Sequence, residues 1–295
     1  MDDEARKAAV ALRNTARWKL TVRDSDYRSP NVVDAFACTI GVKISAEATP
    51  HLYTLMRRSL IDTGLSTYKA KIHYNRTRPF VAAKDDTICS PADADALRKD
   101  GSYPSGHAAF GWGWGLILAE MIPEKANAII QRGYDFGQSR VLCGVHWQSD
   151  VNAGRIVASA AAAQLHSNAD FLKEFQAAKK EVDAALANAK SAPDCSLEQQ
   201  AAAVAQSQVA QTQVALAKQD CERADTLFAQ GAIPKSEFDR LKTQCTAQLY
   251  SATAAQANAD LAGKLAGDTI IRAPIDGFIG ERYVNVGEYV TPASR

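Results

Sequence analysis

Residues 101–120 read GSYPSGHAAFGWGWGLILAE. The apolar run from Ala108 to Ile122 predicts a buried helix that is too short to span a bilayer. Ser105 is a candidate N-cap for this helix, so the backbone N–H groups of Gly106 and His107 would face an anion at the positive end of the helix dipole. Glycine has no Cβ and lets a phosphate approach the backbone closely. The stretch therefore predicts a helix whose N-terminus binds an anion.

Two flanking segments carry cations. Residues 71–79 read KIHYNRTRP and residues 139–150 read SRVLCGVHWQSD. Lys71 and Arg78 are two helical turns apart, which predicts that both side chains leave one face of a helix that ends at the following proline. Arg140 would add a planar guanidinium suited to two phosphate oxygens. Three cations fit phosphoryl transfer, in which negative charge spreads over the equatorial oxygens.

His146 and Asp150 have the spacing of residues that share a helix face. The carboxylate would then accept from one ring nitrogen and leave the other as a nucleophile. His107 comes from a different segment and can perform a different step. Each motif alone is weak evidence for a catalytic site. A histidine beside a tryptophan, for example, is usually a core residue. Three motifs in order between residues 71 and 150 are specific.

The three spacings, Lys-x6-Arg-Pro, Pro-Ser-Gly-His and Ser-Arg-x5-His-x3-Asp, resemble the motifs of the type 2 phosphatidic acid phosphatase and vanadium haloperoxidase superfamily. Residues 101–120 and 131–151 look most like the bacterial class A non-specific acid phosphatases. This resemblance implies a phosphomonoesterase of broad specificity that works below neutral pH without metal or cofactor. It also implies inhibition by phosphate and vanadate.

The resemblance further implies a role for each motif residue. His146, oriented by Asp150, would attack phosphorus to form a phosphohistidine, and His107 would protonate the leaving oxygen. The phosphate oxygens would be held by Lys71, Arg78, Ser105, the Gly106 amide and Arg140. The alternative within the superfamily keeps these residues but binds vanadate and oxidises halide. Haloperoxidases are generally longer chains, and the sequence around PSGH favours the phosphatase.

The rest of the composition excludes several other classes. His51, His73 and His166 lack the spacing of a zinc site. A net charge of +1 gives no bulk attraction to nucleic acid or to an anionic membrane, and no stretch reaches 18 apolar residues. The start of the chain lacks the apolar core of a signal peptide. Since the family is secreted to the periplasm, we expect a periplasmic protein in its mature form.

The composition changes after residue 192. Residues 193–268 are rich in Ala and Gln and predict a long helix broken once, at residues 231–234. Phe238, Leu241, Cys245 and Leu249 approximate a heptad seam, which predicts an antiparallel coiled-coil hairpin. Residues 269–295 predict short strands. We therefore expect a mainly α fold: a helical-bundle acid phosphatase domain at 1–192, a hairpin at 193–268 and a β segment at 269–295.

The tail also resembles a known family. Residues 227–241 and 270–290 resemble the α-hairpin and the second half of the lipoyl-like domain in periplasmic adaptor (membrane fusion) proteins of efflux pumps. A complete lipoyl-like domain needs a first half before the hairpin, and none precedes it here. The resemblance implies contact with an efflux channel and an adaptor or scaffold role. The alternative is an appendage that supplies length or contacts between subunits of a homo-oligomer.

Six cysteines fit an oxidising compartment and allow fifteen pairings. Cys221 and Cys245 are symmetric about residue 233, so they are predicted to pair across the hairpin. Cys143 is predicted to be a packed thiol. The remaining cysteines are unassigned: Cys38, Cys89 and Cys195.

Overall fold

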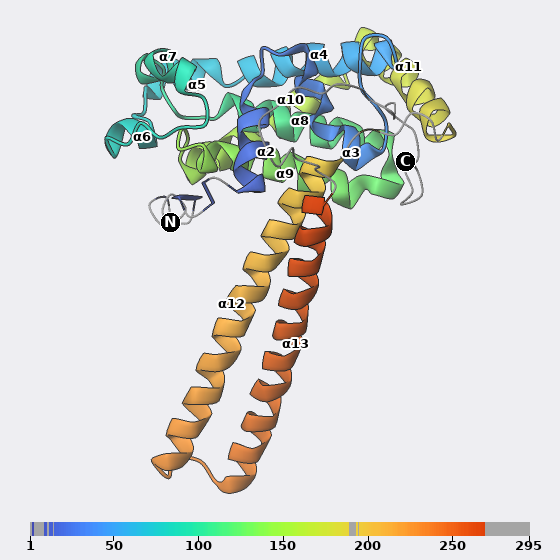
Figure 1. Ribbon diagram of the computed structural model, residues 1–295. Coiled ribbons are helices and arrows are strands. Elements are labelled where there is room, and N and C mark those ends of the chain that lie inside the picture. The colour runs from blue at the N-terminus through green and yellow to red at the C-terminus, as the bar shows by residue number, and fades with distance from the viewer. Residues whose placement is uncertain are drawn as a thin grey trace, which may run out of the picture.

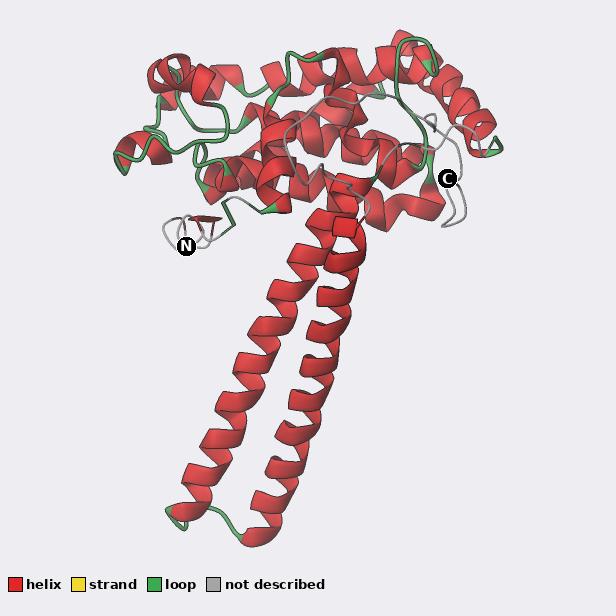
Figure 2. Cartoon of the chain, in the orientation of Figure 1, coloured by secondary structure: helices red, strands yellow, loops and turns green. Residues whose placement is uncertain are grey.

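The computed structural model describes residues 15–188 and 195–268, together with Asp2, Ala9, Val10, Leu12, Arg13 and Pro193. Within these residues every regular element is a helix (Figure 2). The predicted mainly α fold is thus confirmed. The predicted β segment at 269–295 lies outside the described residues.

A helical body carries a long helical hairpin (Figure 1). The α-helices of the body are α2 (Ala16–Ser25), α3 (Ala37–Ile40), α4 (Pro50–Leu65), α5 (Tyr68–Tyr74), α6 (Pro79–Ala82), α7 (Ala94–Lys99), α8 (Gly106–Met121), α9 (Ala126–Leu142), α10 (Gln148–Leu165) and α11 (Ala169–Leu186). Short 3-10 helices lie at Pro30–Phe36, Pro91–Asp93 and Pro123–Lys125. The hairpin consists of α12 (Ser196–Ala229) and α13 (Lys235–Asp268).

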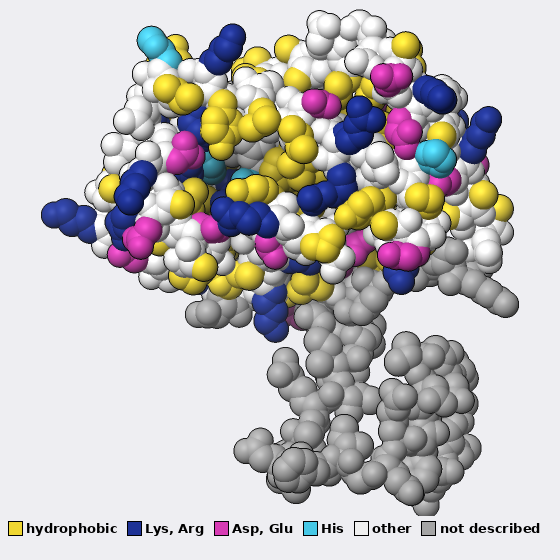
Figure 3. Space-filling model, turned by 90° about the horizontal axis from the view of Figure 1, so that it is seen from above, with side chains coloured by type: hydrophobic (Ala, Val, Ile, Leu, Met, Phe, Trp, Pro, Cys, Tyr) yellow, Lys and Arg dark blue, Asp and Glu magenta, His cyan; other side chains and the backbone are white. Residues whose placement is uncertain are grey.

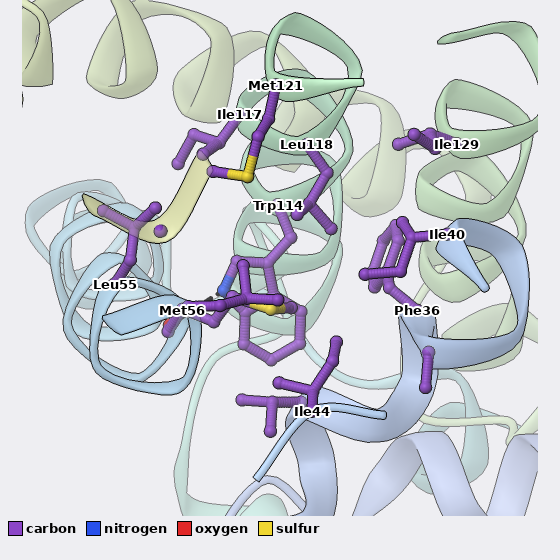
Figure 4. Close-up of a cluster of buried hydrophobic side chains, with 14 of the residues drawn as sticks. Phe36, Ile40, Ile44, Leu55, Met56, Trp114, Ile117, Leu118, Met121 and Ile129 are labelled. Atoms are coloured by element: carbon purple, nitrogen blue, oxygen red, sulfur yellow. Dashed lines mark hydrogen bonds between the residues drawn. The ribbon is translucent and has the colours of Figure 1, made fainter. Parts of the chain in front are cut away.

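Helix α8 is the buried centre of the body, as its apolar sequence predicts. It packs against α4, α9 and α10. Trp114 is fully buried in the core shown in Figure 4, and its indole N–H donates to the Met56 carbonyl at 2.9 Å. A Cβ at Gly111 would lie 2.3 Å from the Phe136 ring, so only glycine lets α9 approach α8 this closely. The glycine-rich sequence of α8 thereby fixes the positions of the helices around it.

The hairpin forms where the sequence predicts it. The chain reverses at Gly231, whose φ of 68° is in the left-handed region that favours glycine. Phe228 and Phe238 stack across the tip with ring centroids 4.4 Å apart. The predicted disulfide between Cys221 and Cys245 is present and joins the two helices.

The base of the hairpin is tied to the body. Cys195, directly before α12, forms a disulfide with Cys38 in α3. Arg23 of α2 forms an ion pair with Glu198 of α12 at 2.6 Å, and α12 packs against α2. The body and the hairpin are therefore joined by a covalent bond in addition to the chain itself.

The prediction for Cys143 is wrong, because Cys143 forms a disulfide with Cys89. The two cysteines are separated by 54 residues and meet in a small buried cluster with Phe80, Ile88 and Val145. Only the tertiary fold brings them together, so spacing along the chain could not reveal the pair.

Among the described residues, no helix is both long enough and apolar enough to cross a membrane.

Candidate active site

Lys71, in α5, and Arg78, directly before α6, approach the same carbonyl oxygen. Lys71 Nζ lies 2.9 Å and Arg78 Nη2 3.1 Å from the Gly101 oxygen. The prediction that one helix carries both side chains is wrong. Helix α5 ends at Tyr74 because Asn75 adopts a left-handed C-cap with φ 38°, and Pro79 begins α6 instead of ending α5. The chain turns between the two cations and still brings them together.

Arg78 is buried in a cage of oxygen atoms. Its guanidinium donates to backbone carbonyls of Leu97, Asp100, Gly101 and Val145 and to the Asp100 carboxylate at 2.8 Å. Its Nη1 lies 3.2 Å from His146 Nε2. A guanidinium only donates, so Nε2 accepts and the ring proton of neutral His146 is on Nδ1. The lone pair of His146 is therefore on Nε2, where it accepts from Arg78.

Arg140 is a buried cation without a carboxylate partner in the described part of the chain. It lies near the end of α9, is 2% exposed, and its Nε has no hydrogen-bond partner there. Its Nη1 lies 3.9 Å from the Cys89 sulfur, which is a weak acceptor. A buried charge is costly unless an opposite charge or hydrogen bonds compensate it. An anion beside Arg140 would supply this compensation.

A network around Ser139, the residue before Arg140, holds the end of α9 in place. Ser139 donates to the buried Asp24 carboxylate at 2.7 Å, and Arg132 pairs with the same carboxylate at 2.5 Å. Arg17 donates to the Ser139 hydroxyl at 3.0 Å. Asp24 is thus bonded to Arg132 and Ser139, and it forms no direct ion pair with Arg140 among the described residues.

His146 follows a tight turn after α9. Gly144 has φ 81°, and the amides of Val145 and His146 both donate to the Arg140 carbonyl. The prediction that His146 and Asp150 share a helix is wrong, because α10 begins at Gln148 and His146 precedes it. His146 Nδ1 nevertheless lies 3.5 Å from Asp150 Oδ2, since the turn folds the ring back over the helix start.

Asp150 is fully buried and its two oxygens have different partners. Oδ2 accepts from the Trp147 amide at 2.8 Å, as a cap of α10. Oδ1 accepts from Arg76 Nη1 at 2.7 Å. Sequence reasoning missed Arg76, because it lies inside the first motif at a position the motif leaves open. Its neighbour Asn75, a residue that tolerates left-handed turns, was the only indication of a turn there.

The N-terminus of α8 is built as predicted. Ser105 is its N-cap and its hydroxyl oxygen accepts from the Ala108 amide at 3.2 Å, which leaves the hydroxyl proton free to donate. Gly106 is the first helical residue, so its amide has no acceptor within the helix. A Cβ at Gly154 of α10 would lie 2.4 Å from the Ser105 carbonyl. Glycine at that position lets α10 bring Asp150 against the cap, where the Ser105 amide donates to the Asp150 carbonyl at 3.0 Å.

His107 lies beside the end of α2. Its Nε2 is 3.1 Å from the Ser25 carbonyl, so this nitrogen carries the ring proton. The ring packs edge-on against Tyr27 at 5.1 Å and against Phe110 at 5.0 Å. His107 is thus held by groups separate from those that hold His146.

In the free enzyme, burial and the cations lower the pKa of both histidines and favour the neutral rings. Burial, followed by the charges of Arg78, Lys71 and Arg140, lowers the pKa of His146 well below 6.5. Burial, followed by Arg140, lowers the pKa of His107 in the same direction. The effect of burial on the pKa is larger for His146, whose side chain is 4% exposed, than for His107, whose side chain is partly exposed. Burial lowers the pKa of Lys71 to about 8 and that of Arg140 to about 9, so both stay charged in acid.

Comparison with known proteins identifies the family. The family model for the PAP2 superfamily matches residues 48–171. An acid phosphatase of Zymomonas mobilis is 42% identical over 202 residues, which are 68% of this chain and 76% of that protein. The chain belongs to the PAP2 superfamily, in its acid phosphatase group.

Two further acid phosphatases show the same likeness. A non-specific acid phosphatase of Providencia stuartii is 47% identical over 58% of this chain and 68% of its own length. One from Salmonella typhimurium is 41% identical over 62% of this chain and 73% of its own. The PAP2 match spans all three motifs, from Lys71 to Asp150.

Other features of this PAP2 chain lie apart from the motifs. A groove of about 580 Å³ is lined by α2, α3, α9 and the start of α12, and contains no motif residue. Within the described ranges, no group of three or more His, Cys, Asp or Glu side chains is placed to hold a metal ion. On the face seen in Figure 3, cationic, anionic and apolar side chains are interspersed, so no single charge dominates it.

Proposed function

We propose that this protein hydrolyses phosphate monoesters of broad specificity, without a metal, through a phosphohistidine on His146. The observation that carries the proposal is the buried Arg140 guanidinium, which lacks a carboxylate partner in the described part of the chain and lowers the pKa of both His146 and His107. A phosphate group would supply the missing negative charge. Lys71, Arg78, the Ser105 hydroxyl and the Gly106 amide would complete the set of groups around its oxygens.

In the first step, His146 Nε2 forms a bond to phosphorus while the bond from phosphorus to the ester oxygen breaks. The leaving oxygen takes a proton from the His107 imidazolium, which forms once bound phosphate offsets the charge of Arg140 that lowers the pKa of His107. Asp150 accepts from Nδ1 and stabilises the positive charge that develops on the imidazole. The low pKa of His146 supports this step, because the nucleophile stays neutral in acid.

In the second step, a water oxygen bonds to phosphorus and the bond to Nε2 breaks. His107, now neutral, takes a proton from the water and regains its acid form. Inorganic phosphate leaves and restores the starting site. Vanadate would inhibit, since its trigonal-bipyramidal adduct with His146 resembles the transition state.

We assign the protein to the periplasm on the support of its cysteines. All six form disulfides, and such bonds persist in oxidising compartments. Relatives named non-specific acid phosphatase are bacterial.

The first test is a p-nitrophenyl phosphate assay at acid pH. Wild-type turnover should survive EDTA and be inhibited by vanadate, and His146→Ala should be inactive yet folded. A matched control is His166→Ala, since this half-exposed histidine pairs with Glu120 far from the motifs. Activity lost to EDTA and restored by zinc or magnesium, or normal turnover by His146→Ala, would sink the proposal. Halide oxidation with peroxide and vanadate would favour the haloperoxidase alternative.

The adaptor-like resemblance of the tail is a second, separate proposal. It is supported by the hairpin, two antiparallel helices of 34 residues each that project from the body (Figure 1). The surface that would contact an efflux channel is the tip around Gly231. Co-purification with an outer-membrane channel, lost on deletion of residues 221–245, would support it. Equal recovery with and without the tip would rule it out.

A further inference from the structure

Arg76 is the only side chain that offers Asp150 a full positive charge within 4 Å among the described residues. Its Nη1 lies 2.7 Å from Asp150 Oδ1. His146 is the other titratable contact of this carboxylate, but its lowered pKa leaves it neutral in the free enzyme. A fully buried carboxylate needs compensation, so Arg76 compensates the charge of Asp150 before the reaction begins.

The geometry divides the work of Asp150 between its two oxygens. Oδ1 is occupied by Arg76, whereas Oδ2 accepts from the Trp147 amide and faces His146 Nδ1 at 3.5 Å. Rotation of the carboxylate would exchange these partners. Because Arg76 holds Oδ1, the carboxylate keeps Oδ2 aimed at the nucleophilic histidine.

Arg76 is itself held by several contacts. Its guanidinium carbon lies 5.4 Å from the centre of the Trp147 ring, and its backbone carbonyl accepts from the Ser102 amide at 2.8 Å. Its side chain also donates to Ser149 at 2.7 Å and pairs with Asp2 at 3.1 Å. These contacts hold the guanidinium in the orientation that reaches Asp150, as a positioning role requires.

From these contacts we infer that Arg76 is a positioning residue of the phosphatase reaction, one that acts on His146 only through Asp150. The inference rests on the proposed function, because it assumes that His146 is the nucleophile. Arg76 donates to no motif residue other than Asp150 in the described part of the chain. Substrate binding by Lys71, Arg78 and Arg140 should therefore not depend on it.

The test is a double-mutant cycle of Arg76→Gln and Asp150→Asn, followed by kcat and KM with p-nitrophenyl phosphate. Arg76→Gln should lower kcat by about 10–100-fold, as is typical for groups that orient a reacting side chain through one contact, and leave KM within about twofold. In the Asp150→Asn background the same change should cost less than about twofold, because the carboxylate it acts on is gone. Arg76→Lys should recover part of kcat, since it retains the charge.

The matched control is Ser149→Ala, which removes another partner of Arg76 and leaves the contact with Asp150 in place. It should have nearly wild-type kcat. Losses that multiply in the double variant, or a rise in KM with kcat unchanged, would overturn the inference. If Arg76→Gln does not fold, Arg76→Lys is compared in the wild-type and Asp150→Asn backgrounds. A smaller loss of kcat in the Asp150→Asn background supports the inference, and losses that multiply overturn it. His146→Ala in the same assay distinguishes failure of the proposed function from failure of the inference about Arg76. If His146→Ala remains active, the proposed function fails. If His146→Ala is inactive and the losses of the double-mutant cycle multiply, only the positioning role of Arg76 fails.

Discussion

His107 is expected to donate a proton, yet its surroundings favour the neutral ring. Burial comes first among the causes of its low pKa, followed by the charge of Arg140 and then by a hydrogen bond to Ser25 that acts in the opposite direction. A bound phosphate would neutralise the cations that oppose protonation. The pKa of His107 should therefore be higher in the substrate complex than in the free enzyme.

This difference predicts two separate basic limbs in the pH profile. A general acid loses activity as pH rises through its pKa, and kcat/KM reports the free enzyme whereas kcat reports the complex. The basic limb of kcat should therefore lie at higher pH than that of kcat/KM. The measurement is a pair of pH profiles for wild type and His107→Ala. Coincident limbs in wild type, or an unchanged separation in His107→Ala, would remove His107 from the acid role.

At the scale of single residues, sequence reasoning located the motif side chains but not all of their contacts. The Ser105 cap was predictable because capping is a local property. The contact of Arg76 with Asp150 was not, since it spans 74 residues and depends on the left-handed turn at Asn75. Such contacts follow from the tertiary fold, which spacing along the chain does not predict.

Among the elements, the hairpin and α8 were predictable and the motif segments were not. The break at residues 231–234 and the Cys221–Cys245 bridge follow from local turn chemistry and from symmetry about the turn. The helix through Lys71 and Arg78 was predicted as continuous, but a cap and a proline divide it. Helical spacing therefore predicted that Lys71 and Arg78 lie close together, but it did not predict the turn that brings them together.

The link between hairpin and body gives a prediction at this scale. Truncation after residue 192 should leave phosphatase activity largely intact, because every motif residue lies between Lys71 and Asp150. It should lower stability, since it removes the Cys38–Cys195 bridge, and native disulfides are typically worth about 2–4 kcal/mol. The measurement is thermal unfolding together with kcat/KM.

The matched control for the truncation is Cys38→Ser with Cys195→Ser in the full-length chain, which breaks the bridge and keeps the hairpin. Equal melting temperatures would assign the stability loss to the bridge. An inactive truncated chain beside an active double-serine variant would show that the hairpin belongs to the phosphatase fold, against our expectation.

For the whole molecule, the buried histidines make stability depend on pH. Both have a folded pKa well below 6.5, so below about pH 6.5 the unfolded chain binds protons that the folded chain does not. Stability conferred by the neutral rings is therefore lost as pH falls from about 6.5. Lys71 acts in another window: between about 8 and 10.5 the unfolded chain keeps a proton that the folded chain releases, so stability rises with pH there.

Thermal melts at pH 7 and pH 5 test this account. The melting temperature should fall in acid, and the fall should be smaller in the variant with both His107→Ala and His146→Ala. Phosphate at about 100 times its Kd should add about 2.7 kcal/mol to wild type and less to the double variant. His51→Ala is the control, because this exposed histidine has a raised pKa through Glu174 and should not reduce the acid sensitivity. An equal acid sensitivity in wild type and the double variant would contradict the prediction.

The most direct test of the central claim is to trap the covalent intermediate. Wild-type protein mixed with ³²P-labelled substrate and quenched within one turnover should carry a label that is stable in base and labile in acid. Peptide mapping should place that label on His146, and His146→Ala should carry none. A label on another residue, or no label in wild type under conditions of full turnover, would contradict the phosphohistidine mechanism.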